Sequence, residues 1–191
     1  MGEWVQVAGR DGLFRAYVAK PTGAPKAAVV AIQEIFGVNH HIRAVADRFA
    51  DAGWLAIAPA LFDRVARGVE LGYTAADLPA ARGTMMQVDT AKALLDIAAA
   101  TAVVRHAGKV AAVGFCWGGA FVDRVAVAAG SGLDAGVSYY GPAPAPSEAV
   151  KVQAPLMIHL AGLDKRVAET AFPWIAALRQ AGKSVAYHGY D

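Results

Sequence analysis

Short apolar runs alternate along the chain with longer segments in which apolar residues recur at helical spacing. Continuous or alternating apolar runs predict strands, whereas apolar residues every three to four positions predict amphipathic helices. The strand pattern occupies residues 3–8, 13–19, 26–33, 54–61, 109–115, 134–141, 154–162 and 183–190. The helical pattern occupies residues 39–53, 88–108, 117–130 and 168–182. The polar and glycine-containing segment 62–87 is expected to run irregularly over the surface.

This alternation of strands and helices predicts an α/β fold with a mostly parallel sheet and helices on both of its faces. The opening hairpin, residues 3–19, is expected to add antiparallel strands at one edge of the sheet. At 191 residues the chain has the length of one domain with a substantial core. The proline-rich stretch 141–148 is too short to separate two domains, so residues 1–191 are expected to form a single domain.

Composition and charge exclude several classes of partner. Although 56% of the residues are hydrophobic, no apolar run approaches the roughly 20 residues of a membrane-spanning helix. The net charge of +2 comes from scattered residues, and without a basic cluster no nucleic acid is expected to bind. A single cysteine excludes an internal disulfide and a cysteine-rich metal site, and neither metal nor cofactor is expected. With no secretory signal at the N-terminus, this favours a cytoplasmic protein.

The one cysteine, Cys116, lies in the stretch Gly-Phe-Cys-Trp-Gly at 114–118, between a predicted strand and a predicted helix. This is the G-x-nucleophile-x-G spacing, in which the chain reverses sharply and small flanking residues avoid a collision. The N–H groups that begin the following helix would favour a thiolate and stabilise an oxyanion. The backbone amides of Trp117 and Ile35 are the expected oxyanion donors.

Simpler interpretations compete with a catalytic cysteine. A lone cysteine is often a small buried hydrophobe, but the flanking glycines and the strand-to-helix context favour a nucleophile. A dinucleotide-binding loop would need G-x-G-x-x-G after the first strand, which is absent. A nucleophile of this kind requires an acid and then a histidine later in the chain. Asp164, just past an apolar strand, is the candidate acid, and a solvated turn aspartate is the alternative.

Several stretches are similar to the dienelactone hydrolase family, a cysteine branch of the α/β-hydrolases. They are "AIQEIFGVNHHIR", "GWLAIAPALFDR", "VGFCWGGAF", "SYYG" and "PLMIHLAGLDKRV", in the family's order and over nearly the whole chain. The resemblance implies an α/β-hydrolase domain and a monomeric, carboxymethylenebutenolidase-like enzyme. Such an enzyme would open a small-molecule lactone or related ester through a Cys-His-Asp triad and a thioester. The resemblance also implies that Glu34 contacts and helps to activate the resting thiol, although Glu34 could instead be a strand-end carboxylate paired with an arginine.

The chain departs from the family at its end. In the family the last strand runs into a motif resembling Tyr-Pro-Gly-Ala-x-His-x-Phe, whose histidine is catalytic. Here "VAYHGYD" matches the approach to that motif, so the resemblance places the histidine and a closing helix beyond Asp191. His188 lies inside the predicted strand and is not assigned this role. The domain is therefore expected to be incomplete at its C-terminus. The favoured explanations are that the sequence is a piece of a longer reading frame or has been trimmed. The third explanation is a natural protein that has lost its catalytic base.

Two further points concern the substrate and rival functions. Arg82 and Arg43 are candidate cations for a substrate carboxylate, and Tyr139 and Trp117 are candidate walls of the pocket.

A non-catalytic ligand-binding protein with the same fold is the main alternative to an enzyme. A redox sensor ranks last because a resolving cysteine is lacking. Gly118 and Gly119 favour an enzyme over a binding protein, since a protein without a catalytic nucleophile would have little need of them.

Overall fold

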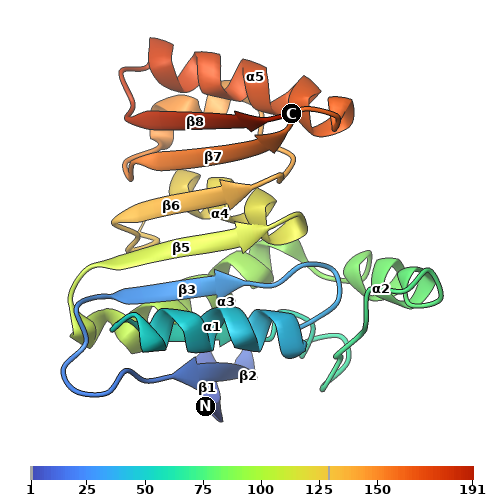
Figure 1. Ribbon diagram of the computed structural model, residues 1–191, viewed down its shortest axis with the longest axis vertical. Coiled ribbons are helices and arrows are strands. Elements are labelled where there is room, and N and C mark those ends of the chain that lie inside the picture. The colour runs from blue at the N-terminus through green and yellow to red at the C-terminus, as the bar shows by residue number, and fades with distance from the viewer. Residues whose placement is uncertain (1, 129) are drawn as a thin grey trace.

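The computed structural model describes residues 2–128 and 130–191, and their strands form one mixed sheet. The order of strands across the sheet is β1-β2-β4-β3-β5-β6-β7-β8 (Figure 1). β1 pairs with β2 and β2 with β4 in antiparallel fashion, and every other pair is parallel. The strands are β1 (Glu3–Gly9), β2 (Gly12–Ala19), β3 (Ala28–Ile32), β4 (Leu55–Pro59), β5 (Val110–Phe115), β6 (Ala135–Tyr139), β7 (Leu156–Ala161) and β8 (Val185–Tyr190). The predicted sheet with an antiparallel edge is confirmed.

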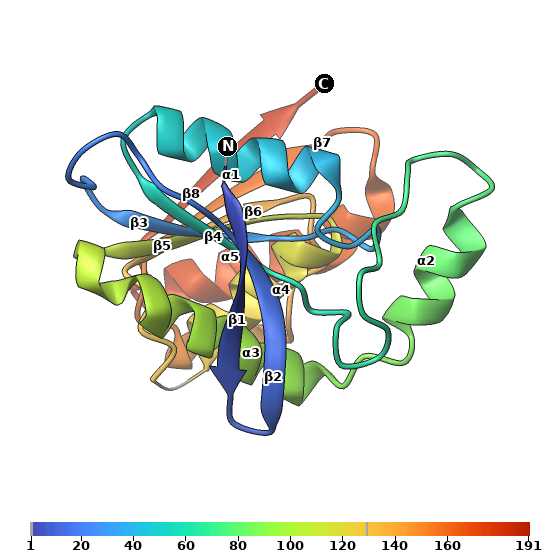
Figure 2. The ribbon, with the colours of Figure 1, turned by 90° about the horizontal axis from the view of Figure 1, so that it is seen from below.

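Helices cover both faces of this sheet, as predicted. Figure 2 shows α1 on one side of the sheet and α3, α4 and α5 on the other. The helices are α1 (His40–Asp51), α2 (Leu78–Met85), α3 (Thr90–Val104), α4 (Trp117–Val127) and α5 (Lys165–Gln180), and short 3₁₀ turns span η1 (Arg105–Ala107) and η2 (Pro146–Lys151). Each face therefore has its own apolar core, and the central strands β3 and β4 are buried between the two. None of the helices in the described ranges is long and apolar enough to cross a membrane.

The first helix illustrates how the sequence specifies its position. The Asn39 side chain accepts a hydrogen bond from the Ile42 amide at 3.3 Å and so caps the helix. Ile42, Val45 and Ala46 form the stripe that packs on the sheet. Gly53 has φ = +93°, a conformation that favours glycine, just past the end of the helix. The predicted cap at Asn39 and the predicted stop at Gly53 are therefore both present.

The segment 62–87 differs from its prediction, because it contains the helix α2. Only Ala81 of this short helix is buried, so the sequence carries little of the apolar periodicity that indicates a helix. The part before α2 is held against the chain that follows β3. The Leu71 amide donates to the Phe36 carbonyl at 2.9 Å, and the Asn39 side-chain amide donates to the Leu71 carbonyl at 2.9 Å.

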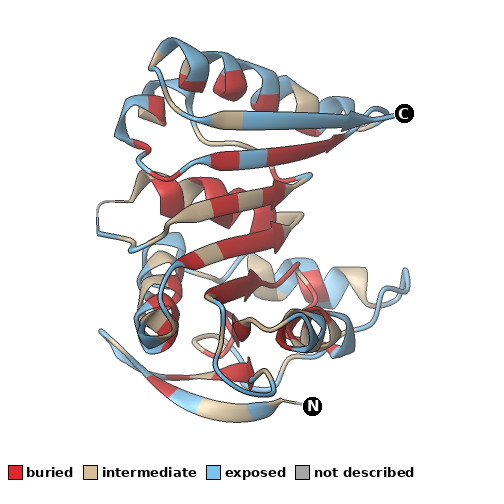
Figure 3. Cartoon of the chain, turned by 60° about the vertical axis from the view of Figure 1, so that its left-hand side comes forward, coloured by how far each residue is buried: buried red, intermediate tan, exposed pale blue. Residues whose placement is uncertain are grey.

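The sheet is unevenly covered on the side of α1. This helix lies over β2, β3 and β4, whereas much of β8 is exposed (Figure 3). On this side Phe115, Tyr139 and His159 form a stack of rings across β5, β6 and β7, with centroids 5.0 and 4.3 Å apart. The ring of His188 continues the stack on β8, 5.1 Å from His159.

Candidate active site

Cys116 occupies a strained turn between the end of β5 and the start of α4. Its backbone has φ = 54° and ψ = −116°, outside the conformations that residues with a side chain usually adopt. Such a conformation costs about 1–3 kcal/mol and persists only where the surroundings impose it. Here the Cys116 amide donates to the Tyr139 carbonyl at 2.9 Å, and the Ala120 amide donates to the Cys116 carbonyl at 3.1 Å. The turn therefore joins β5, β6 and α4.

The glycines on either side of Cys116 are required by close backbone contacts. A Cβ atom on Gly114 would lie 2.1 Å from the Gly118 carbonyl oxygen. A Cβ atom on Gly118 would lie 2.4 Å from the Ile32 carbonyl oxygen at the end of β3. The spacing predicted from the sequence thus has a direct steric cause.

Substituting Gly118→Ala is expected to lower the free energy of unfolding by about 1–3 kcal/mol, or to prevent folding, because the added methyl group meets backbone. Gly83→Ala is the matched control, since Gly83 lies within α2 and a Cβ there meets nothing within 4 Å. The control is expected to gain up to about 1 kcal/mol from helix propensity. Urea unfolding measures both, and a Gly118→Ala midpoint equal to that of the parent would contradict the steric explanation.

The electrostatic surroundings of the sulfur oppose its ionisation. Cys116 is half-buried, and burial is the largest effect that raises the pKa of its thiol. The Trp117 amide and then the Arg166 guanidinium lower this pKa, whereas the carboxylates of Glu34 and Asp164 raise it. The helix N-terminus was expected to favour the thiolate, and the Trp117 amide acts in that direction. Burial outweighs it, so the pKa is raised overall.

Glu34 follows β3 and is 9% exposed, with both carboxylate oxygens bound by phenols. The Tyr73 hydroxyl donates to Oε2 at 2.5 Å, and the Tyr140 hydroxyl donates to Oε1 at 3.3 Å. Burial and the carboxylate raise the pKa of Tyr73 to about 12, so it remains a donor. The pKa of Tyr140 is also raised, by burial first and then by Glu34. Neither tyrosine was predicted as a site residue.

Asp164 lies just past the end of β7, as predicted, and is the N-cap residue of α5. Its Oδ1 accepts a hydrogen bond from the Val167 amide at 3.1 Å, so the carboxylate caps that helix. The helix starts at Lys165, three residues earlier than its predicted range. Because Asp164 and Glu34 both influence the Cys116 thiol, the three predicted residues meet at the carboxyl edge of the parallel strands. Ligands of such sheets usually bind at this edge.

A cavity of about 480 Å³ opens at Cys116. It is lined by Ile35, Arg82, Met85, Met86, Cys116, Trp117, Pro142 and Arg166. Arg82 was predicted to bind substrate, whereas Arg166 was not predicted. Arg43 instead pairs with Glu70 and donates to the Val38 carbonyl. Tyr139, a predicted wall residue, is not in this lining, because its ring lies in the stack on the α1 side of the sheet.

The described histidines of β7 and β8 belong to that ring stack. His159 Nδ1 is hydrogen-bonded to the Tyr190 hydroxyl at 2.8 Å, and its ring lies parallel to that of Tyr139. Burial and then the neighbouring His188 lower the pKa of His159. Within residues 2–128 and 130–191, no histidine is hydrogen-bonded to Cys116 or to Asp164.

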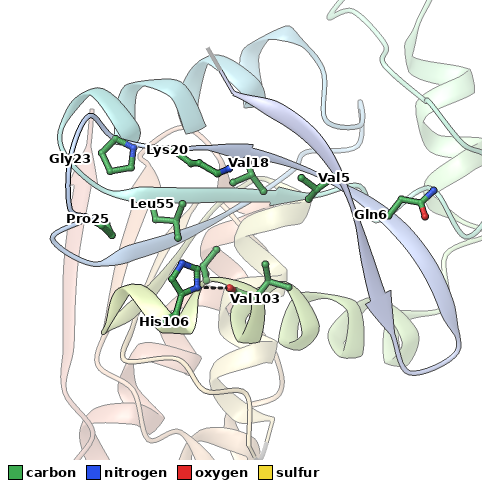
Figure 4. A pocket seen from close by; sticks show the side chains of 11 residues that line it. Val5, Gln6, Val18, Lys20, Gly23, Pro25, Leu55, Val103 and His106 are labelled. Carbon is green, nitrogen blue, oxygen red and sulfur yellow. Dashed lines mark hydrogen bonds between the residues drawn. The ribbon is translucent and has the colours of Figure 1, made fainter.

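A second cavity, also of about 480 Å³, lies at the opposite end of the strands (Figure 4). Its walls come from the β1–β2 hairpin, the start of β4 and the end of α3, and include Val5, Val18, Leu55 and Val103. The His106 ring is hydrogen-bonded through Nδ1 to the Val103 carbonyl at 2.9 Å. None of the predicted catalytic residues lines this cavity.

Comparison with known proteins agrees with this arrangement. Residues 14–191 match the model of the dienelactone hydrolase family. A carboxymethylenebutenolidase of Pseudomonas putida is 33% identical over 170 residues, which cover 85% of this chain and 71% of the relative. A provisionally named carboxymethylenebutenolidase of Synechocystis is 41% identical over 109 residues, 54% of this chain, and the match spans only 44% of that relative.

A solved structure is similar over the full length of the chain. It is a provisionally named dienelactone hydrolase of Klebsiella pneumoniae, with a TM-score of 0.87 and 28% sequence identity. The superposition covers 100% of this chain and 85% of that one. With a family match over nearly all its residues, the chain belongs to the dienelactone hydrolase family.

Proposed function

We propose that this protein hydrolyses a lactone or a related carboxylic ester, with Cys116 as the nucleophile. The observation that carries the proposal is the strained turn that places Cys116 in the lining of a cavity, next to the start of α4. Membership of a family of dienelactone hydrolases, and the carboxymethylenebutenolidase name of the P. putida relative, support an ester substrate. The test is whether an activated ester transfers its acyl group to Cys116.

In this mechanism the Cys116 thiolate attacks the carbonyl carbon of the substrate. The carbonyl π electrons move to the oxygen, which accepts hydrogen bonds from the Trp117 and Ile35 amides. Collapse of this intermediate breaks the ester C–O bond and leaves a thioester on sulfur. Water then attacks the thioester, and release of the thiolate gives the carboxylic acid. Both amides belong to residues that line the cavity, which supports this assignment.

The general base is the remaining part of the proposed triad. The family resemblance implies a catalytic histidine as this base, and Asp164 is the carboxylate proposed to orient it. The position of Asp164 at the end of β7, close enough to influence the thiol, supports this role. Without such a base the second step is expected to be slow, because water must be deprotonated as it attacks the thioester.

The substrate is proposed to carry a carboxylate or another anionic group besides its ester. Arg82 on α2 and Arg166 on α5 both line the cavity at Cys116, and guanidinium groups pair well with carboxylates. Met85, Met86 and Pro142 supply an apolar wall for the rest of the molecule. These residues favour a small amphiphilic ester over a long neutral one.

Arg166→Gln is expected to reduce the preference of Cys116 for an anionic reagent. The measurement is the ratio of alkylation rates with iodoacetate and iodoacetamide, which differ in charge and react with the same thiolate. The ratio should fall by about two- to fivefold, the effect of one partly exposed charge. Lys165→Gln is the control, since Lys165 is adjacent and exposed but does not line the cavity. Equal ratios in the parent and in Arg166→Gln would remove Arg166 from the anion site.

A further inference from the structure

Glu34 is held by two phenols that come from distant parts of the chain. Tyr73 belongs to the segment between β4 and α2, and Tyr140 follows β6. The two hydrogen bonds differ in length: Tyr73 donates to Oε2 at 2.5 Å, whereas Tyr140 donates to Oε1 at 3.3 Å. The carboxylate is thus bound tightly on one oxygen and loosely on the other.

Tyr73 is placed by contacts that do not involve Glu34. Its ring packs on Phe36, with centroids 4.6 Å apart, and also contacts His41 at 6.0 Å. Two residues before it, Leu71 exchanges hydrogen bonds with Phe36 and Asn39. Because these contacts fix the ring from the side, its hydroxyl can determine where Oε2 lies.

Tyr140 is the group that holds the other oxygen. Tyr140 has φ = 41°, and its amide donates to the His159 carbonyl at 2.8 Å, so the start of its side chain is also fixed. The Tyr140 phenol interacts electrostatically with both Glu34 and Cys116, and its hydrogen bond turns Oε1 of Glu34 toward Tyr140.

We propose that Tyr73 is a positioning residue that anchors Oε2 of Glu34, leaves Oε1 to Tyr140, and thereby sets the negative field that the carboxylate exerts on the Cys116 thiol. The proposal deepens the hydrolase function and rests on it only in taking Cys116 as the reactive group.

Loss of the Tyr73 hydroxyl has a predictable electrostatic consequence. A hydrogen bond spreads the carboxylate charge, and without it a stronger negative field acts on the thiolate. The thiol of Tyr73→Phe should therefore ionise at higher pH than that of the parent. Glu34→Gln removes the charge itself, so its thiol should ionise at lower pH. The groups that face the thiol are Glu34, Tyr140, Asp164, Arg166 and the Trp117 amide, with Arg82 in the same cavity.

The experiment is the pH profile of Cys116 alkylation by iodoacetamide, which requires no hydrolysis. Below the midpoint, Tyr73→Phe should react about threefold more slowly than the parent and Glu34→Gln at least about threefold faster, each a shift of about half a pH unit. Tyr140→Phe should shift the profile less, because its hydrogen bond is longer. In the Glu34→Gln background, Tyr73→Phe should have no further effect.

A matched control separates this effect from general loosening of the fold. Tyr17→Phe removes another phenol that donates to a carboxylate, that of Asp47 at 2.9 Å. It should leave the alkylation profile unchanged. A parental profile in Tyr73→Phe, or an equal shift with and without Glu34, would overturn the positioning role. If the shifts occur but no ester acylates Cys116, the hydrolase function fails and the role of Tyr73 stands.

Discussion

Incubation with 4-nitrophenyl acetate is expected to place one acetyl group per chain on Cys116. The sulfur attacks the acetyl carbonyl, the C–O bond to the aryl group breaks, and one equivalent of 4-nitrophenolate is released. The acetyl thioester of Cys116 is the expected adduct. Intact-protein mass spectrometry detects the adduct, peptide mapping locates it, and the absorbance burst gives its rate.

Cys116→Ala is the decisive variant for this experiment. Alanine accepts the same strained backbone conformation as cysteine, since both have a Cβ, so the fold should be retained. The burst is expected to fall to about a hundredth of its parental rate or less, because the nucleophile is gone. An equal adduct on Cys116→Ala would assign the chemistry to another residue. A thiol that reacts with iodoacetamide but never with esters would favour the ligand-binding alternative.

The pH dependence of this acylation follows from the environment of the thiol. Burial raises the pKa of Cys116, so the thiolate fraction is small near neutral pH and grows as the pH increases. The acylation rate of Cys116 should therefore still be rising at a pH at which an exposed cysteine is already fully ionised. A substrate anion paired with Arg166 would offset part of the positive charge that lowers the pKa of the Cys116 thiol. The negative charge of Glu34, which raises this pKa, therefore matters more during turnover.

The fold was predictable because its signals are local and periodic. The buried strands are continuous apolar runs such as Ala28–Ile32, and the stop of α1 is marked by Gly53. Alternating elements leave few topologies open, so a parallel sheet follows from the order alone. Helix α2 lacked such a signal because Ala81 is its one buried residue, so no apolar stripe recurs along it.

The site was only partly predictable, because its parts are joined by tertiary contacts. Gly114 and Gly118 predict the turn at Cys116, because their backbones approach each other too closely for a Cβ atom and they lie only four residues apart in sequence. Tyr73 reaches Glu34 across 39 positions of sequence, and its place depends on how the segment before α2 packs on Phe36. Arg166 lies in the first turn of α5, which Asp164 caps, and lines the cavity from there.

The stability of the protein is expected to decrease between about pH 4 and pH 7 because of one buried carboxyl group. Asp123 is 1% exposed, and it lies on α4 in the helix that begins at Cys116. Its Oδ1 accepts a hydrogen bond from the Trp174 indole N–H at 3.3 Å, which links α4 to α5. Burial raises the pKa of Asp123 from 3.8 to about 7, despite opposing effects of Ser138 and Trp174.

The sign of this dependence follows from the number of protons bound in each state. Between the two pKa values the folded protein keeps the Asp123 proton while the unfolded chain loses it, so rising pH favours unfolding. The stabilisation is fully present below pH 3.8 and is lost as the pH rises through about 7. The loss is on the order of 4 kcal/mol over this window, at 1.36 kcal/mol per unit of pKa shift. Asp134 has a lowered pKa, so its contribution is lost only at more acidic pH.

Asp123→Asn is expected to abolish this component of the pH dependence. Asparagine retains an oxygen that can accept from Trp174 but has no proton to lose. His159 has a lowered pKa and changes stability in the opposite sense within the same window, but it is present in both proteins and cancels in their comparison. Urea unfolding between pH 4 and pH 8 gives the two curves, and their difference should favour the variant increasingly as the pH rises to about 7 and then level off. Parallel curves would show that Asp123 is already ionised in the folded protein at pH 4, and that the helix carrying Cys116 is packed on a charge instead of on a neutral acid.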